Sequence, residues 1–254
     1  FHRLSPAVVA VDMMRDLSAG GALMGLLGSA YFYPYALMQL PAGLLSDSWG
    51  PRKTITVSFI VAGGASLLFG LAPTASWAIA ARALVGLGVS MLFVPAMKAL
   101  TSWFKRSEFA MMAGALMAVG GLGVLTAAAP LAYMSSVLGW RGSFAAIGAV
   151  TLILAAALWL LVRDKPEDLG FPPVEAPPAA SAAGEAPPLK KGVVLVLRRK
   201  AFWPVAAWLF FTAGIFFTFG GLWGGPYLMH VFGLTKAEAG RILSMQALDR
   251  KSVV

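Results

Sequence analysis

The chain has 254 residues, of which 59% are hydrophobic and 12% charged, with a mean hydropathy of +0.77 and a formal net charge of +9. Soluble domains contain about 25% charged residues, so this composition excludes an ordinary soluble fold and indicates a polytopic membrane protein. The excess of bases does not indicate nucleic-acid binding, because the bases gather in gaps between apolar runs, as they do in cytoplasmic loops.

The first eleven residues, FHRLSPAVVAV, look like the end of a transmembrane helix, and six complete apolar windows follow. Each is close to the roughly twenty residues that a helix needs to cross a bilayer. β-strands are disfavoured because the runs are long, rich in Ala, Leu and Gly, and do not alternate, so an all-α fold is predicted. The predicted spans are residues 21–45, 54–73, 77–100, 109–133, 142–162 and 202–229, and residues 239–248 look like the start of another.

One gap is much longer than the others and separates the last two complete spans. Its Pro/Ala/Glu-rich middle cannot bury a core, which predicts a flexible linker over residues 164–200. Most bases fall on the linker's side of the membrane, so the positive-inside rule predicts that this side is cytoplasmic. These bases are Arg52, Lys53, Lys105, Arg106, Arg163, Lys165, Lys190, Lys191, Arg198, Arg199 and Lys200.

Metal and cofactor chemistry is not expected. The chain has no cysteine, which excludes disulfides and thiolate metal sites, and its two histidines, His2 and His230, lie far apart in the sequence. The spans also lack the clustered acids, histidines and nucleophiles that a membrane enzyme would need. We therefore predict no cofactor, no metal and no enzymatic activity.

The gap between the first two complete spans reads GLLSDSWGPRK, residues 43–53. This closely resembles the signature loop of the major facilitator superfamily, which lies on the cytoplasmic side between transmembrane helices two and three. The resemblance implies a fold of two six-helix bundles, with a long cytoplasmic linker after helix six. The residues that carry it are Gly43, Leu45, Ser46, Asp47, Gly50, Pro51, Arg52 and Lys53.

The resemblance covers residues 1–248 and implies a fragment of the fold: the end of helix one, helices two to seven and the start of helix eight. Residues 1–163 would form the N-terminal bundle with its first helix truncated, and residues 201–248 would begin the C-terminal bundle. Residues 249–254, DRKSVV, interrupt an apolar run, and we interpret them as a non-native tail. The alternative is an ordinary polar segment that ends a helix.

The loop residues suit a conformational gate. Gly43 allows a helix end to pack closely, and Gly50 permits a turn that a side chain would hinder. Asp47 suits a helix N-terminus, where the dipole favours negative charge. The family resemblance implies that this acid holds the two halves together in one state. Arg52 and Lys53 are predicted to anchor the loop at anionic lipid and also to pair with Asp47.

One position departs from the signature. Ser48 stands where the family usually has a base, which weakens the prediction of a full charge relay. A plain positive-inside turn is the alternative interpretation of the loop.

A second resemblance lies in the span 77–100, where RALVGLG supplies Arg82, Gly86 and Gly88. It resembles the family's motif arginine-x-x-x-glycine-x-glycine in helix four. A charge inside a membrane span is unfavourable and marks a functional site by default, so Arg82 is a candidate substrate-binding residue. Alternatively, Arg82 lies near the outer end of its helix and reaches water.

Two further groups complete the predicted site. His2 and Arg3 precede a short LSPA stretch, which resembles helix one of the family's organic-anion symporters, where an acid–arginine pair is typical. Arg3 can bind a carboxylate or phosphate in a bidentate manner, and His2 can carry a coupling proton. Tyr31, Tyr35 and Gln39 share one helix face at i, i+4 and i+8, which predicts that they face a cavity. A purely structural role is the alternative for each group.

These features predict a secondary transporter that moves a small organic solute, most simply an anion, by alternating access with proton symport. A drug or metabolite antiporter is the alternative within transport, although no acid lies in the middle of a span. A membrane receptor or sensor on the same scaffold is the alternative from another class. The expected partners are a small-molecule substrate, a proton and the lipid bilayer. We expect the full-length protein to be a monomer in the inner (cytoplasmic) membrane of the cell.

Overall fold

The computed structural model describes residues 1–18, 20–174, 189–219, 223–235, 238 and 242. These residues form helices and loops and contain no β-strand, which confirms the predicted all-α fold. The chain divides into two compact units, Phe1–Glu175 and Ala176–Val254, which are considered separately. The predicted tail 249–254 and nearly all of 239–248 lie outside the described residues.

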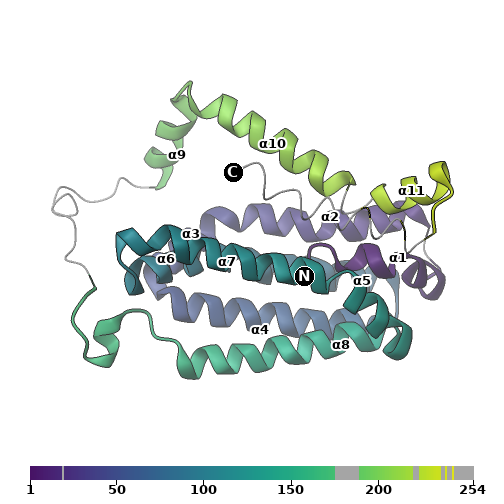
Figure 1. Cartoon of the computed structure of the whole chain (residues 1–254), viewed down its shortest axis with the longest axis horizontal. Coiled ribbons are helices and arrows are strands. Elements are labelled where there is room, and N and C mark those ends of the chain that lie inside the picture. Colours follow the sequence, from purple (N-terminus) through teal and green to yellow (C-terminus); the bar gives the residue numbers. More distant parts are fainter. Residues whose placement is uncertain (19, 175–188, 220–222, 236–237, 239–241, 243–254) are drawn as a thin grey trace. The chain divides into compact units, whose positions relative to one another are not determined.

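The first unit is a bundle of eight α-helices that run up and down beside one another, followed by a short 3-10 turn (Figure 1). The helices are α1 (Ser5–Asp16), α2 (Gly21–Leu37), α3 (Gln39–Trp49), α4 (Pro51–Gly70), α5 (Ala75–Ser90), α6 (Phe93–Trp103), α7 (Arg106–Thr126) and α8 (Ala129–Leu161). In the second unit, the described helices are α9 (Leu189–Arg198), α10 (Phe202–Thr218) and α11 (Gly224–Phe232).

Four helical stretches among the described residues are long and apolar enough to cross a membrane: Pro51–Gly70, Ala75–Trp103, Arg106–Thr126 and Ala129–Leu161. They correspond to four of the six predicted spans. The first predicted span, 21–45, forms α2 and α3, which are separated at Met38. In the last, the apolar stretch Phe202–Ile215 is shorter than a full span.

Three prolines explain three of the helix breaks that the predicted spans did not include. Proline has no N–H and cannot bond the carbonyl four residues before it, so a helix is weakest at that carbonyl. The carbonyl four residues before Pro41 belongs to Leu37, the last residue of α2. The one before Pro95 belongs to Met91, which follows α5, and the one before Pro130 belongs to Thr126, the last residue of α7. The predicted span 109–133 is therefore wrong in its bounds, because α7 ends at Thr126 and α8 begins at Ala129.

The break between α5 and α6 is supported by a neighbouring helix. The carbonyl of Met91, which Pro95 leaves without an intrahelical donor, accepts a hydrogen bond from the buried Ser58 Oγ of α4 at 3.2 Å. The same hydroxyl lies 2.7 Å from the carbonyl of Thr54 within α4. A buried carbonyl without a partner is unfavourable, so this contact lets the chain interrupt a helix at membrane depth.

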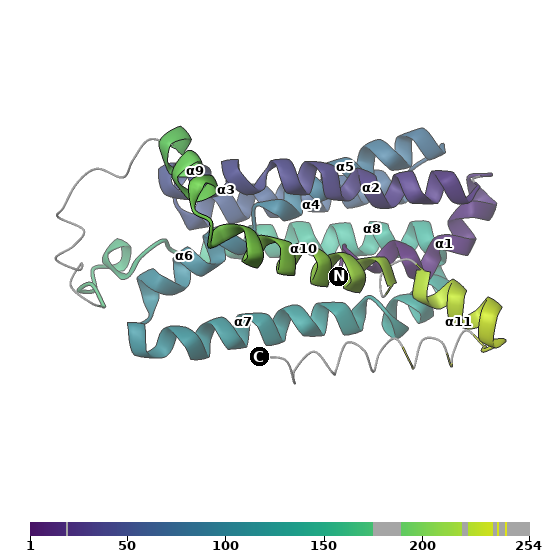
Figure 2. The same ribbon diagram turned by 90° about the horizontal axis from the view of Figure 1, so that it is seen from above.

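The centre of the first unit is α4, which runs alongside α8 and also packs on α5 (Figure 1). Glycines make these contacts close. A Cβ at Gly63 would lie 3.0 Å from the carbonyl oxygen of Gly148, and one at Gly88 would lie 2.6 Å from the backbone nitrogen of Ala62. Small residues allow such approach between membrane helices. By contrast, α7 lies at the edge of the unit and has no buried residue (Figure 2).

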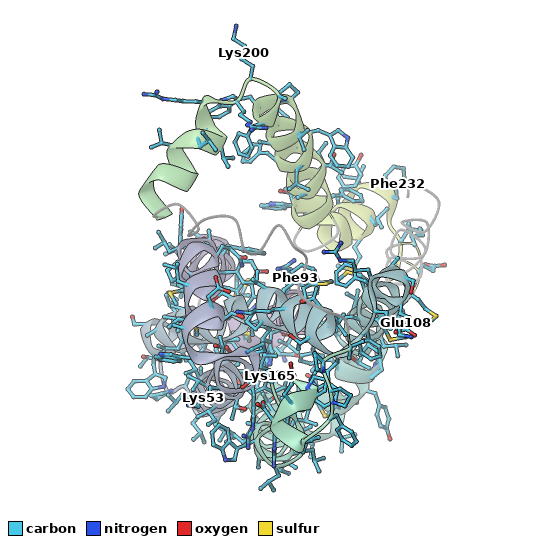
Figure 3. All side chains as sticks on the ribbon, turned by 90° about the vertical axis from the view of Figure 1, so that its left-hand side faces the viewer. Lys53, Phe93, Glu108, Lys165, Lys200 and Phe232 are labelled. Carbon is cyan, nitrogen blue, oxygen red and sulfur yellow. The ribbon has the colours of Figure 1, made fainter. Side chains whose placement is uncertain are left out.

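Bases gather at one end of the first unit, where α4 and α7 begin and α8 ends. Figure 3 looks onto this end and shows Lys53, Glu108 and Lys165 there. We call it the basic end; its bases are Arg52, Lys53, Lys105, Arg106, Arg163 and Lys165.

At the opposite end of the unit, one carboxylate joins α1 to α8. Asp16, the last residue of α1, accepts hydrogen bonds from Trp140 Nε1 at 2.9 Å and from Arg141 Nη1, both on α8. Arg141 Nη2 also donates to the carbonyl of Ala72 between α4 and α5, at 3.3 Å. This ion pair therefore ties three parts of the bundle together.

Candidate functional site

Two arginines and two tyrosines meet where the N-terminus packs against α2 and α5. The Arg3 guanidinium lies over the Tyr35 ring, with its carbon 4.8 Å from the ring centroid, and that of Arg82 lies over the Tyr31 ring at 4.6 Å. The two rings, one helical turn apart on α2, are stacked with centroids 5.8 Å apart. The structure thus places four of the six predicted substrate-binding residues in one layered cluster, which we call the arginine–tyrosine cluster.

Arg82 lies at the bottom of this cluster and is only 2% exposed. Its Nη2 donates a hydrogen bond to the carbonyl of His2, while its Nε has no hydrogen-bond partner. Among the described residues, Arg82 forms no ion pair with a carboxylate. A buried guanidinium without an acid leaves positive charge uncompensated, and such charge attracts an anion. The alternative in which Arg82 reaches water at its helix end is wrong for this structure.

A glycine allows this close arrangement of α5 on α2. A Cβ at Gly86 would lie 3.0 Å from Tyr31 Cα, and its contact with the Tyr31 carbonyl oxygen would be closer still. Gly86 is one turn after Arg82 on α5. Within the motif RALVGLG, Gly86 thus lets α5 pack closely on α2 at the point where Arg82 stacks on Tyr31.

The other two predicted substrate-binding residues, His2 and Gln39, make different contacts. His2 Nδ1 is 3.5 Å from Ser66 Oγ on α4, and the His2 carbonyl accepts from Arg82. Gln39, the first residue of α3, donates from Nε2 to the carbonyl of Ser90 at the end of α5, at 3.5 Å. His2 is thus bonded to the cluster through its backbone, whereas Gln39 contacts the break between α5 and α6.

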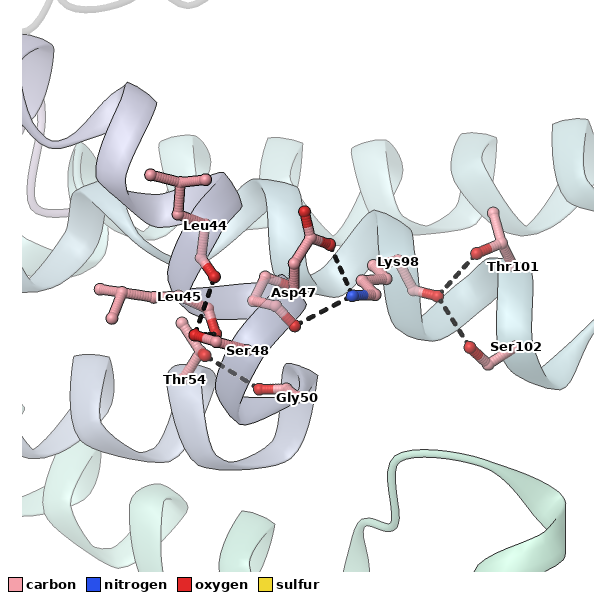
Figure 4. A network of polar contacts seen from close by, with 10 residues as sticks. Leu44, Leu45, Asp47, Ser48, Gly50, Thr54, Lys98, Thr101 and Ser102 are labelled. Carbon is pink, nitrogen blue, oxygen red and sulfur yellow. Dashed lines mark hydrogen bonds and ion pairs between the residues drawn. The ribbon is translucent and has the colours of Figure 1, made fainter. Parts of the chain in front are cut away.

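Asp47 forms an ion pair that the sequence analysis missed. Lys98 Nζ, on α6, lies 2.6 Å from Asp47 Oδ1 and 3.0 Å from the carbonyl of Ser46 (Figure 4). Ser48 is not part of this pair, because its hydroxyl bonds the carbonyl of Leu44 in its own helix at 2.9 Å. The only sequence signal for Lys98 was a base near the end of the apolar window 77–100, which also contains Arg82.

Arg52 faces α8 instead of Asp47. Its Nε donates to the carbonyl of Trp159 at 3.1 Å, and its guanidinium carbon lies 4.2 Å from the centroid of that ring. Lys53 is exposed. The predicted pairing of these two bases with Asp47 is therefore wrong; anchoring at anionic lipid stays a prediction.

A second acid caps the start of α4. Asp164 Oδ1 accepts a hydrogen bond from the Arg52 backbone N–H at 2.6 Å. Gly50 has φ +84°, and a Cβ there would lie 2.8 Å from Asp164 Oδ2. The glycine is therefore needed twice, for a left-handed turn and for room for the carboxylate. A negative charge at a helix N-terminus is favourable. At the start of α4 this charge is supplied by Asp164 and not by Asp47, for which the sequence predicted the role.

Gly43 does not show the predicted close packing, because no heavy atom in the described part of the chain lies within 4 Å of where its Cβ would be. The signature loop is instead attached to the bundle through Asp47 on α6 and Arg52 on α8. Trp103 adds a third attachment at the basic end, since its Nε1 donates to the carbonyl of Arg163 at 3.0 Å. Asp164 and Trp159 were missed by sequence reasoning because their partners are more than a hundred residues away.

These sites differ in the chemistry they offer. The arginine–tyrosine cluster supplies guanidinium donors and aromatic faces and is suited to bind a carboxylate or a similar anion. The Asp47–Lys98 ion pair and the hydrogen bonds of Arg52, Trp103 and Asp164 at the basic end are suited to hold helix ends together. Within the described residues, no group of three or more His, Cys, Asp or Glu side chains is placed to hold a metal ion.

Comparison with known proteins gives a consistent result. Residues 4–248 match the family model of the Major Facilitator Superfamily. The chain is 28% identical over 165 residues to the probable sulfoacetate transporter SauU of Cupriavidus necator, covering 65% of this chain and 38% of that protein. It is 25% identical over 243 residues to the hexuronate transporter of Bacillus subtilis, covering 92% of this chain and 54% of that protein.

The fold also matches a solved structure. It is similar to the crystal structure of a bacterial homologue of the human lysosomal transporter Spinster, in an inward-facing and unoccupied conformation, with a TM-score of 0.72 and 24% identity. The match covers 94% of this chain and 54% of that chain, and it shows the fold alone. The chain thus spans between 38% and 54% of the length of these three proteins.

Proposed function

The chain belongs to the Major Facilitator Superfamily, and on this premise we propose that it is part of a secondary transporter that moves a small organic anion across a membrane by alternating access. In such a transporter, two helix bundles rock around a site near the bilayer midplane. Residues 1–163 contribute the first bundle, residues 164–200 the linker, and residues 201–248 the beginning of the second bundle.

The observation that carries this proposal is the arginine–tyrosine cluster. Arg82 is buried without a carboxylate partner in the described part of the chain, and Arg3 is stacked in the same cluster but is partly exposed. A substrate carboxylate can accept two parallel hydrogen bonds from Arg3, while the charge of Arg82 behind it strengthens the attraction. The relatives' names support this class, because sulfoacetate and hexuronate are both anions.

The proposal includes proton-coupled symport. His2 is adjacent in sequence to Arg3, and its carbonyl is bonded by Arg82. A movement of Arg82 on substrate binding would therefore reach the backbone of the residue that we propose carries the proton. Exchange of the substrate against protons is the alternative, and the direction of coupling distinguishes the two.

The signature loop would act as the conformational gate in this transporter. We place the basic end on the cytoplasmic side of the inner membrane, following the positive-inside rule. Asp47, on the exposed side of α3, is then available to the second bundle while Lys98 holds it in the first. In this proposal Gly43, Gly50, Arg52 and Lys53 belong to the same gate: Gly43 lies on α3 with the acid, Gly50 forms the turn, and Arg52 and Lys53 begin α4.

Uptake by the full-length protein tests the substrate class. The protein is reconstituted in proteoliposomes and supplied with radiolabelled glucuronate, sulfoacetate or, as a neutral control, glucose. Arg3→Ala should reduce anion uptake at least 100-fold and Arg3→Lys less, because lysine keeps the charge but not the bidentate geometry. Arg15→Ala, which removes an exposed base from α1, is the matched control and should transport normally. Normal uptake by Arg3→Ala would refute the proposed site.

Imposed proton gradients test the coupling. With a more acidic exterior, symport predicts accumulation of the anion against its gradient, and a protonophore should abolish it. Accumulation driven by the opposite gradient would instead establish antiport. Uptake that ignores both gradients would remove proton coupling from the proposal and leave anion transport standing.

A further inference from the structure

Helix α9 is short, strongly basic and separate from the arginine–tyrosine cluster. It runs from Leu189 to Arg198, and only three residues separate it from α10. The twelve residues 189–200 contain no acid and five bases, which are Lys190, Lys191, Arg198, Arg199 and Lys200. None of these bases has a role in the proposed transport site.

Four of the six Leu and Val residues of α9 follow a helical period. Positions 189, 193, 196 and 197 are all Leu or Val and fall at i, i+4, i+7 and i+8, so they share one face of the helix. Positions 191 and 198 are bases, seven residues apart, and share the opposite face, which also carries the apolar Val194 and Leu195 beside them. Val196 and Leu197 are 46% and 45% exposed, which means that the described part of the chain does not cover this apolar face.

The corner between α9 and α10 is closed by hydrogen bonds. Trp203 Nε1, in the first turn of α10, donates to the carbonyl of Leu197 at 3.1 Å. The Phe202 backbone N–H donates to the Arg199 carbonyl at 3.0 Å. The indole thus satisfies one of the carbonyls that the end of α9 leaves free. In Figure 3, Lys200 projects outward from this corner.

The apolar composition of α10 determines the depth of α9 relative to the membrane. The stretch Phe202–Ile215 is an apolar helix, and its Trp208, Phe210 and Phe211 are all exposed. Such a helix requires lipid around it. Because the corner is short and hydrogen-bonded, α9 is held at the level where α10 meets water. Trp203 at the corner fits this level, where tryptophan is enriched.

We propose that α9 is an interfacial helix that lies on the membrane surface and binds anionic lipid headgroups there. Its apolar face enters the boundary between headgroups and acyl chains, and its bases pair with lipid phosphates. The absence of acids favours an anionic surface over a mixed-charge protein surface as the partner. A negatively charged leaflet attracts each nearby base, and removing one base weakens the association about fivefold.

Site-directed spin labelling tests the proposal directly, because the chain has no native cysteine. A nitroxide is attached at Val196→Cys and, for the polar face, at Arg198→Cys. The full-length protein is reconstituted in nanodiscs of phosphatidylcholine alone or with 30% phosphatidylglycerol. Power saturation with oxygen and with a water-soluble nickel chelate reports the depth of each label.

The expected result is a Val196 label that is more accessible to oxygen, an Arg198 label that is more accessible to nickel, and deeper immersion with phosphatidylglycerol. Replacing Arg199 and Lys200 by Gln should lower the ratio of immersed to exposed α9 on the order of 25-fold, at about fivefold for each base. Arg199→Lys is the matched control that keeps the charge, and it should retain immersion.

Two outcomes would overturn the proposal. If the Val196 label is equally accessible to nickel in both nanodiscs, α9 lies in water. If the label is immobile and inaccessible to both reagents, α9 is covered by protein. Neither result depends on transport, so failure here is distinguishable from failure of the proposed function.

Discussion

Replacing Lys98 with Gln should destabilise the first unit more than replacing Asp47 with Asn, although the two residues form one ion pair. Lys98 Nζ binds both the Asp47 carboxylate, at 2.6 Å, and the Ser46 carbonyl, at 3.0 Å. The two side chains are 38% and 72% exposed. An exposed ion pair contributes about 0.2–1 kcal/mol, and a hydrogen bond from a charged donor to a carbonyl contributes about 1.5 kcal/mol at the lower end.

These values give an order of effects. Asp47→Asn should lower the free energy of unfolding by less than about 1 kcal/mol, because Lys98 keeps its carbonyl partner. Lys98→Gln loses both contacts and should lower it by about 2 kcal/mol. In the double mutant, the coupling energy should stay below about 1 kcal/mol. The same values imply that any large transport defect of Asp47→Asn reflects the gate and not misfolding.

Reversible unfolding in mixed detergent micelles measures the four members of this cycle. Lys53→Gln removes an exposed lysine from the same loop and is the control, with an expected change within about 0.5 kcal/mol. Uptake by the reconstituted full-length variants is measured in parallel. A larger loss of stability for Asp47→Asn than for Lys98→Gln would show that the main partner of Asp47 is not Lys98, and the reasoning would fail.

Three further substitutions test the packing. Gly86→Ala places a methyl group against the backbone of α2 and should cost about 1–3 kcal/mol of stability, whereas Gly28→Ala, where the site is open, should cost little; thermal unfolding compares them. Asp164→Ala removes the cap of α4 and should cost about 1 kcal/mol in the same assay, and a neutral result would mean that the cap contributes nothing. Ser58→Ala leaves the carbonyl at the break between α5 and α6 without its donor and should cost about 1–3 kcal/mol; faster hydrogen exchange should be confined to that break.

Composition and span length predicted the all-α membrane fold because both follow from the need to satisfy backbone groups in lipid. The bounds were less predictable. Span 109–133 was wrong because the apolar run continues across Ala127 and Ala128, and only Pro130 marks the break. A hydropathy window counts side chains, whereas the break is caused by a missing backbone N–H.

The candidate site likewise contains features that the sequence predicted and features that it could not predict. Periodicity alone placed Tyr31 and Tyr35 on one face, and the structure stacks them. No local pattern could pair Arg52 with Trp159, because this contact depends on how α4 and α8 meet in space. The role of Lys98 could not be predicted for a related reason. In the sequence, a lysine at the end of an apolar window gives the same pattern whether it pairs with a loop residue or extends into water.

The glycine contact between α4 and α8 has a mechanical consequence. A Cβ at Gly148 would lie 2.8 Å from the carbonyl oxygen of Gly63, so the two backbones touch and cannot slide past one another without collision. Helices α4 and α8 should therefore move together as one rigid body. Compliance is expected instead at Leu37 and at Met91, whose carbonyls Pro41 and Pro95 leave without an intrahelical donor. Bending of the bundle would then be concentrated at those two joints, one just after Tyr35 on α2 and the other beyond Arg82 at the end of α5.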